Sequence, residues 1–197
     1  MANQASVSKP FLELNNQVGY HSSAQWRLHN KGTLSIGYYN NKATPHEIQN
    51  GQYGWNTRFH HLSMAWRLSN NLSFASQYIS GKTLMQNAQR QKIVNNDFNS
   101  GFLALSYKWR GLVETNKHKS TLRAEHFSVT DNDTTINDNN NENGKAMTLS
   151  HTYRLAKHWF LSGELIIIDS HRTARMYEGN DIDLIEKHIQ IGVRYFF

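Results

Sequence analysis

The chain has 197 residues, a formal net charge of +6, only 38% hydrophobic residues and a mean hydropathy of −0.68. This apolar content is poor for the core of a globular domain of such length, although aromatic residues make up 12%. The absence of cysteine excludes disulfides and thiolate chemistry, and no apolar run approaches the roughly 18 residues that a membrane-spanning helix needs.

The N-terminal stretch MANQASVSKP lacks the basic region and apolar core of a secretory signal. We expect that such a leader was removed or that the true start lies elsewhere. Ser6 to Leu14 could form a first strand, but Pro10 removes a backbone donor and makes this segment a weak candidate.

From there the sequence alternates apolar and polar residues with a period of two, which is typical of β-strands. In GFLALSYKWR, Leu103 and Leu105 share one face of an extended chain, while Ala104 and Ser106 share the other. The pattern predicts about nine strands and no convincing helix. These strands are expected near residues 17–29, 33–40, 55–69, 71–83, 98–110, 119–130, 145–155, 158–169 and 184–197.

Short and long connections alternate along the chain. Short turns are expected at 30–32, 69–71 and 156–157, with a somewhat longer one at 111–118. Long polar loops are expected at 41–54, 84–97, 131–144 and 171–183. The turn segments WRLHNKGTLS, WRLSNNLSFA and YRLAKHWFLS also resemble one another, which indicates a repeating hairpin. A membrane barrel has this arrangement, with short periplasmic turns and long outer loops.

The last nine residues, IQIGVRYFF, place every apolar side chain on one face of a strand at the very end of the chain. An outer-membrane barrel buries such a face in lipid and needs only a narrow apolar band, which explains the negative hydropathy. Aromatic residues then form a girdle at the short turns, and Tyr38, Trp55 and Tyr78 lie toward the long loops. The short-turn girdle comprises Trp26, Trp66, Trp109, Tyr153, Trp159 and Phe197. The alternative is that these aromatic residues are strand formers in a soluble core.

The ending IQIGVRYFF resembles the C-terminal signal of bacterial outer-membrane proteins that the barrel-assembly machinery recognises, with Tyr195 and Phe197 as its aromatic residues. The stretches WFLSGELIIIDSHRTARMYEG and EKHIQIGVRYFF are similar to the closing hairpin of Gram-negative porin-like proteins, loosely related to phosphate-selective porins. The resemblance implies an all-β, antiparallel up-and-down transmembrane β-barrel in the cell outer membrane. It also implies contact with outer-membrane lipid and lipopolysaccharide, and a homotrimer as one possible assembly.

The resemblance implies a barrel of about sixteen strands, so we expect the single domain over residues 1–197 to be the C-terminal portion of such a barrel. Strand parity agrees, because counting back from a periplasmic C-terminus makes the first of nine strands begin on the outer side. A complete ten-stranded barrel, with 6–14 as its first strand, is the alternative.

Motifs of catalysis or metal binding are weak. Ser80-Gly81-Lys82-Thr83 resembles the end of a phosphate loop, but no helix follows it. Asp169-Ser170-His171 has the residue types of a hydrolase triad, yet neighbours on a strand point to opposite faces. His60-His61, near His46 and Glu47, diverge for the same reason. We therefore expect no enzyme, no catalytic residue, no metal site and no cofactor.

The acidic loop DNDTTINDNNNENG lacks the glycine and terminal glutamate spacing of a calcium loop and is expected to be an extracellular loop. The net charge of +6 invites a nucleic-acid partner. The basic residues form no continuous run, however, so we expect no nucleic-acid binding.

Basic residues instead recur beside the turns on the polar parity of alternate strands, where a barrel has its lumen. We predict that they line a pore near its periplasmic end. The predicted pore-lining residues are Arg27, Arg67, Lys108, Arg110, Arg123, Arg154 and Arg194. Glu125, Glu164, Glu186 and His188 share that parity and could pair with some of them, so a network that only braces the wall is the alternative.

Two functions follow from these observations. One is a porin-like channel for passive diffusion of small hydrophilic solutes or ions, with a preference for anions. The other is a small, complete and non-conducting barrel that acts as an adhesin, a structural protein or a membrane-embedded hydrolase.

Overall fold

In the computed structural model, residues 14–111 and 118–197 are described, and they form a nine-stranded antiparallel sheet in which sequence neighbours pair. Its strands are β1 (Tyr20–Leu28), β2 (Gly32–Asn40), β5 (Asn56–Arg67), β6 (Leu72–Gln86), β7 (Lys92–Trp109), β8 (His118–Asp131), β9 (Glu142–Arg154), β10 (Trp159–Arg172) and β11 (Asp183–Tyr195). A separate small hairpin pairs β3 (Ile48–Gln49) with β4 (Gln52–Tyr53).

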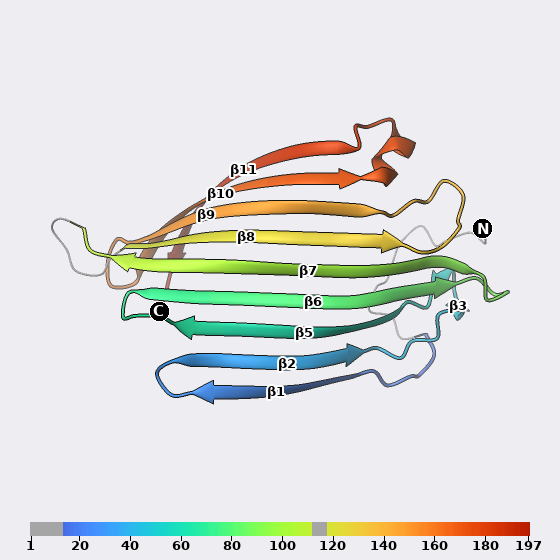
Figure 1. Ribbon diagram of the computed structural model, residues 1–197, viewed down its shortest axis with the longest axis horizontal. Coiled ribbons are helices and arrows are strands. Elements are labelled where there is room, and N and C mark those ends of the chain that lie inside the picture. The colour runs from blue at the N-terminus through green and yellow to red at the C-terminus, as the bar shows by residue number, and fades with distance from the viewer. Residues whose placement is uncertain (1–13, 112–117) are drawn as a thin grey trace.

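The sheet is curved, with β1 and β11 as its edges, and its last strands curl behind the others (Figure 1). Short turns lie at one end of the strands, together with the C-terminus, and longer connections lie at the other end (Figure 1). The predicted all-β, antiparallel, up-and-down fold is confirmed. In the part of the chain that the structure describes, no helix has the length and apolarity to cross a membrane.

The tight turns follow from their residues. Asn30 adopts a left-handed φ of 58°, which asparagine tolerates better than most residues, and the Lys31 N–H donates to the Leu28 carbonyl at 3.1 Å. In the next turn, the Ser69 hydroxyl accepts backbone N–H bonds from Asn71 and Leu72 at 3.3 and 3.1 Å. Side chains that replace lost ladder bonds therefore allow the chain to reverse within a few residues.

The predicted long loop at 84–97 is wrong. Strands β6 and β7 continue through most of it, with Leu84 opposite Asn95, and only residues 87–91 connect them. Asn95 is polar and yet only 3% exposed, because its backbone N–H donates to the Asp133 carboxylate and its amide donates to the Asn132 carbonyl. Contacts with a distant loop thus satisfy a segment whose composition alone indicates a loop.

Two smaller expectations also need correction. The connection after β10 contains a 3₁₀ helix, Thr173–Glu178, although no helix was predicted. The last strand ends at Tyr195, two residues before the predicted end, where the Phe196 N–H donates to the His158 carbonyl at 2.9 Å. Residues 6–13 of the weak tenth strand and 112–117 of the predicted 111–118 turn lie outside the described residues.

Candidate functional site: the polar face of the sheet

The usual relation between polarity and burial is inverted in this sheet. Leu103 and Ile191, on the apolar face, are 60% and 79% exposed. Across the sheet, the Arg123 and Glu125 side chains are only 40% and 25% exposed. Because so much apolar surface is not stable in water, this face must meet lipid, and the opposite face must meet water.

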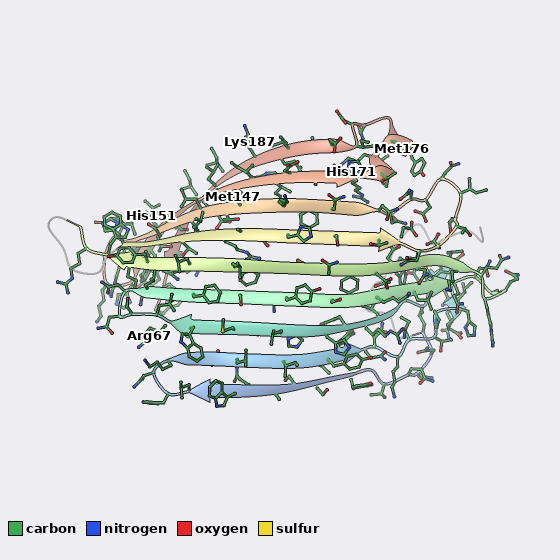
Figure 2. All side chains as sticks on the ribbon, viewed as in Figure 1. Arg67, Met147, His151, His171, Met176 and Lys187 are labelled. Atoms are coloured by element: carbon green, nitrogen blue, oxygen red, sulfur yellow. The ribbon has the colours of Figure 1, made fainter. Side chains whose placement is uncertain are left out.

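The cross-strand register places six of the seven predicted pore-lining residues on the polar face. Arg27 lies opposite Thr33, and this row continues across β5 to β8 through Ala65, Ala75 and Ala104 to Arg123. Arg67 lies opposite Ser73, and the side chain of this arginine is labelled in Figure 2. Lys108, Arg154 and Arg194 share the same parity, and Arg110 follows just after the end of β7.

Most of these cations lie at the same level, beside the short turns. Each is the immediate neighbour, along its strand, of an aromatic residue on the apolar face, as in Trp26-Arg27, Trp66-Arg67 and Tyr153-Arg154. Since neighbours on a strand point to opposite faces, an aromatic wall outside is matched by positive charge inside. We call this set the mouth ring: Arg27, Arg67, Lys108, Lys119, Arg154 and Arg194.

Sequence reasoning missed Lys119, a member of this ring. It lies directly opposite Lys108 in the β7–β8 register, so two like charges face each other. In the sequence, Lys119 is the neighbour of His118, just as other ring cations are neighbours of aromatic residues. His118 lies at the level of the girdle, because it pairs with Trp109 and stacks on its ring at a centroid distance of 4.2 Å.

A hollow of about 500 Å³ opens on the polar face beside part of the mouth ring. Arg27, Arg67 and Lys119 of the mouth ring and Lys31 of the adjoining turn supply its positive charges. The remaining wall includes small side chains, which leave space rather than fill it: Thr33, Ala65, Ser73, Ala75 and Ser106. The arrangement can hold water and anions next to several fixed cations.

Arg123 differs from the mouth ring, because it lies farther along its strand and is paired. Its guanidinium is 2.6 Å from the Glu125 carboxylate and lies over the Phe102 ring at 4.0 Å. Arg154 is also engaged, since it donates to the carbonyls of Ala156 and Lys157. These two arginines brace the wall, whereas Arg27, Arg67 and Lys119 line the hollow. Of these, Arg27 also donates to the Gln25 side chain at 3.4 Å.

The polar face is not polar throughout, which the simple two-face interpretation did not predict. Toward the long connections it carries Tyr39 and Phe59, whose rings stack at 5.0 Å. His21 and His61 lie beside them, with their Nε2 atoms 3.1 Å apart. Gly81 makes room there, because a Cβ at this position would lie 2.6 Å from Phe98 and 2.5 Å from Phe59.

The aromatic residues of the predicted girdle lie on the apolar face near the short turns. Trp26 and Trp66 are neighbours at a centroid distance of 6.4 Å, and Trp159 contacts Tyr195 at 4.9 Å. Trp109 and Tyr153 both flank His118. Phe197 lies beyond the last strand, edge-on to Tyr195 at 5.3 Å. Phe74 belongs to the same level but was not predicted.

The motifs that resembled catalytic sites have separate partners. Ser170 accepts a hydrogen bond from Arg175. His171, which is labelled in Figure 2, lies 2.7 Å from Asp183. Lys82, from the phosphate-loop-like sequence, lies in a strand and is 3.4 Å from Asp97. Residues 14–111 and 118–197 contain no group of three or more potential metal ligands.

The acidic loop uses its oxygen atoms to hold its own backbone. Asp131 accepts the Asn140 N–H, and Asp133 accepts the N–H groups of Thr135 and Asn95. Burial raises the pKa of Asp133, but hydrogen bonds from Thr135 and Asn95 outweigh it and hold the pKa below the ordinary value of 3.8. This carboxylate therefore anchors the loop to the start of β7.

The anchor should weaken in acid. A depressed pKa in the folded state contributes stability that is present above the ordinary value of 3.8 and is lost as the pH falls through the folded value. We expect the chemical shift of the Asn95 amide to change as the pH falls below 3.8 and Asp133 becomes protonated. In Asp133→Ala, this signal should already be shifted at neutral pH. Asp138→Ala is the control, because it removes a carboxylate of the same loop that accepts a hydrogen bond from the Asn140 side chain and not from the Asn95 N–H. The Asn95 signal should stay in place in this variant. An Asn95 signal insensitive to pH would contradict the assignment.

Comparison with known proteins agrees with this geometry. Residues 4–194 match the family described as "Putative beta-barrel porin-2, OmpL-like". No curated protein matches the chain.

Two solved structures of an outer membrane protein of Vibrio cholerae share the fold. The loop L8 deletion mutant of OmpT has a TM-score of 0.60 and 14% identity, over 90% of this chain and 52% of that one. In-vitro folded OmpT has a TM-score of 0.58 and 14% identity, over 91% and 55%. The chain thus spans about half the length of these structures, and the likeness concerns the fold.

Proposed function

Because the chain belongs to the beta-barrel porin-2, OmpL-like family, and is thus a porin-like barrel of the outer membrane, we propose that it lines a pore for passive diffusion of small hydrophilic solutes and ions. The proposal includes a preference for anions. It involves no chemical step, since a fixed wall of charges and a water-filled path suffice for diffusion.

The observation that carries the proposal is the open hollow beside the mouth ring. A lumen filled by side chains would place large residues opposite Arg27 and Arg67, but their cross-strand partners are Thr33 and Ser73. The next positions along the row of Arg27 are Ala65 and Ala75. Fixed cations beside water attract anions, and a low-dielectric wall strengthens their field.

The distribution of acids supports anion preference at this end of the pore. On the polar face, Glu164 and Glu186 lie five and nine residues along their strands from Trp159 and Tyr195, the girdle-level aromatic residues. Glu125 is already paired with Arg123. Charges of the mouth ring are therefore not cancelled at their own level.

Strand direction supports a larger wall. The sheet has nine strands in alternating directions, so β1 and β11 run the same way and could not close on each other as an antiparallel pair. Bacterial up-and-down barrels close with an even strand number. The described strands are accordingly part of the proposed wall, and further strands complete it.

Neutralising the mouth ring should reduce anion selectivity. We expect the reversal potential of the parent, measured across a planar bilayer in a potassium chloride gradient, to indicate anion preference. In the double variant Arg27→Gln, Arg67→Gln, the reversal potential should move toward zero. The effect should be largest near 0.1 M salt, where the Debye length is about 10 Å, and small near 1 M, where it is about 3 Å.

A matched variant removes two cations elsewhere. Arg90→Gln, Lys92→Gln changes the net charge equally but lies at the far connection between β6 and β7, where Lys92 begins the strand. Its reversal potential should equal that of the parent. A cation-selective parent, or equal shifts in both variants, would show that the mouth ring does not govern permeation.

A further inference from the structure

Cations also occur on the apolar face, at one level. Lys82, Lys145 and Lys187 point to the same side as Leu103, as the strand register shows. Arg58 lies directly opposite Lys82 on that side. We call these residues the rim belt: Arg58, Lys82, Lys145 and Lys187. Figure 2 shows Lys187 on β11, near the outer edge of the sheet.

The level of the rim belt follows from the strands themselves. Each member lies eight residues from an apolar-face aromatic residue near the short turns: Arg58 from Trp66, Lys82 from Phe74, Lys145 from Tyr153 and Lys187 from Tyr195. Eight residues span about 26 Å along a strand. In a barrel with strands tilted by about 40°, the belt therefore lies about 20 Å above the girdle, near the outer edge of the apolar band.

Arg58 and Lys82 form the densest part of the belt. Like charges that face each other across two strands repel, so this pair needs a counter-charge. Asp97, 3.4 Å from Lys82, supplies one. Within residues 14–111 and 118–197, Arg58 has no carboxylate within salt-bridge distance, and it is exposed.

These two cations line a polar hollow of about 460 Å³ on the apolar face. Its wall also carries hydrogen-bonding groups and one carboxylate, that of Asp97, which is paired with Lys82. The hydrogen-bonding residues are Tyr38, His60, Ser80, Asn99 and Thr130. The Tyr38 and His60 rings lie 4.6 Å apart at its edge. Such a hollow suits an anionic group with several oxygen atoms, because guanidinium, ammonium and hydroxyl groups can all donate to it.

A second, apolar hollow of about 610 Å³ lies next to the first on the same face, and Asn99 lines both. Leu34, Leu62 and Leu103 form its apolar wall. Its depth comes from small residues, Ser76, Gly101 and Ala124, where neighbouring strands carry larger side chains. This second hollow reaches up to the belt, where Lys145 lines it, and extends from there toward the short turns, where hydrocarbon chains lie.

From this arrangement we infer that the protein binds a phosphorylated, acylated lipid of the outer leaflet. Its phosphate lies between Arg58 and Lys82, and one acyl chain occupies the hollow beneath. Long loops of outer-membrane barrels face outside, so the rim belt lies in the outer leaflet. The lipid site is distinct from the proposed pore, because the belt and the mouth ring point to opposite faces of the sheet.

A solute in transit does not explain the belt. Arg58 and Lys82 have the parity of Leu62 and Tyr78, which face lipid, and not the parity of the residues around the mouth ring. A ligand that reaches them must already be in the membrane. The inference rests on the outer-membrane location of the family and does not depend on conduction.

Lipid retention tests the site. The full-length protein is extracted from outer membranes in mild detergent, and binding of lipid A, dephosphorylated lipid A and inorganic phosphate is measured by native mass spectrometry and titration. We expect lipid A to bind, and binding to fall roughly 30-fold in Arg58→Gln, Lys82→Gln, since each cation beside an anionic headgroup contributes about a factor of five. Dephosphorylated lipid A should bind the parent as weakly as lipid A binds the variant.

Further variants separate the two parts of the site. Ala124→Phe fills the apolar hollow without adding charge and should cause a partial loss of lipid A binding. Arg90→Gln, Lys92→Gln removes two cations outside the belt and should bind lipid A like the parent. Heat-dependent gel mobility shows that each variant is folded.

Specific outcomes would overturn the assignment. Equal binding of lipid A and its dephosphorylated form would exclude phosphate recognition by the belt. Inorganic phosphate that binds as tightly as lipid A would show that the site takes a soluble anion. Unchanged lipid A binding in Arg58→Gln, Lys82→Gln would remove the site, whereas the reversal-potential test of the pore would be unaffected.

Discussion

Replacing Leu103 by arginine is expected to destabilise the membrane-inserted protein by about 2–4 kcal/mol, the cost of an arginine on the lipid face near the bilayer midplane. Leu103 is 60% exposed on the apolar face. It lies six residues from Trp109, which places it about 15 Å above the girdle, in the middle of the apolar band. The measurement is the free energy of unfolding in urea after reconstitution into phospholipid vesicles.

The adjacent residue is the control. Ala104 points to the polar face, opposite Ala75 and Arg123. Ala104→Arg should cost less than about 1 kcal/mol, because water and the nearby Glu125 carboxylate offset repulsion from Arg123. Equal losses in the two variants would contradict the assignment of the faces.

The second large effect concerns assembly. Changing both Tyr195 and Phe197 to serine is expected to remove most of the assembled barrel from membrane fractions while leaving synthesis unaffected. Both aromatic rings lie at the C-terminal end of β11, where Tyr195 contacts Trp159 at 4.9 Å and Phe197 at 5.3 Å. We propose that the barrel-assembly machinery reads these residues from this end of the chain. Heat-dependent gel mobility of membrane fractions measures the assembled protein.

Phe196 provides a matched comparison. Its ring packs edge-on against Phe160 at 5.3 Å and lies near Arg194, both residues of the opposite face. Phe196→Ser removes an aromatic residue that lies between Tyr195 and Phe197 in the sequence but on the opposite face, so it should leave assembly largely intact. If Phe196→Ser reduced assembly more than the double change of Tyr195 and Phe197, the C-terminal signal would not depend on the aromatic residues of the apolar face.

Much of the fold could be predicted from the sequence because its information is local. Apolar and polar residues alternate with a period of two, as in Leu103 to Ser106, and only an extended strand separates them into two faces. The same alternation placed an aromatic residue and a basic residue side by side at the end of several strands. Strand type, the two faces and the shared parity of the mouth ring all depend on this one periodicity.

Other features depended on partners far away in the chain. The stretch around Asn95 is polar and has the composition of a loop, but pairing with Leu84 and a bond to Asp133 make it a strand. The aromatic cluster on the polar face needs Gly81 beside Phe59 and Phe98, three residues from separate strands. No local pattern contains such a contact.

The sequence by itself determined which residues face lipid and which face water, because the pleat of a strand assigns neighbours to opposite faces. Only the tertiary structure decided which residues became neighbours across strands. The register brought Arg58 opposite Lys82, and it set Arg27 and Arg67 around one hollow while pairing Arg123 with Glu125 within its own strand. The physical reason is that register is set by ladder hydrogen bonds and turn lengths between segments, which the periodicity of a single strand does not contain.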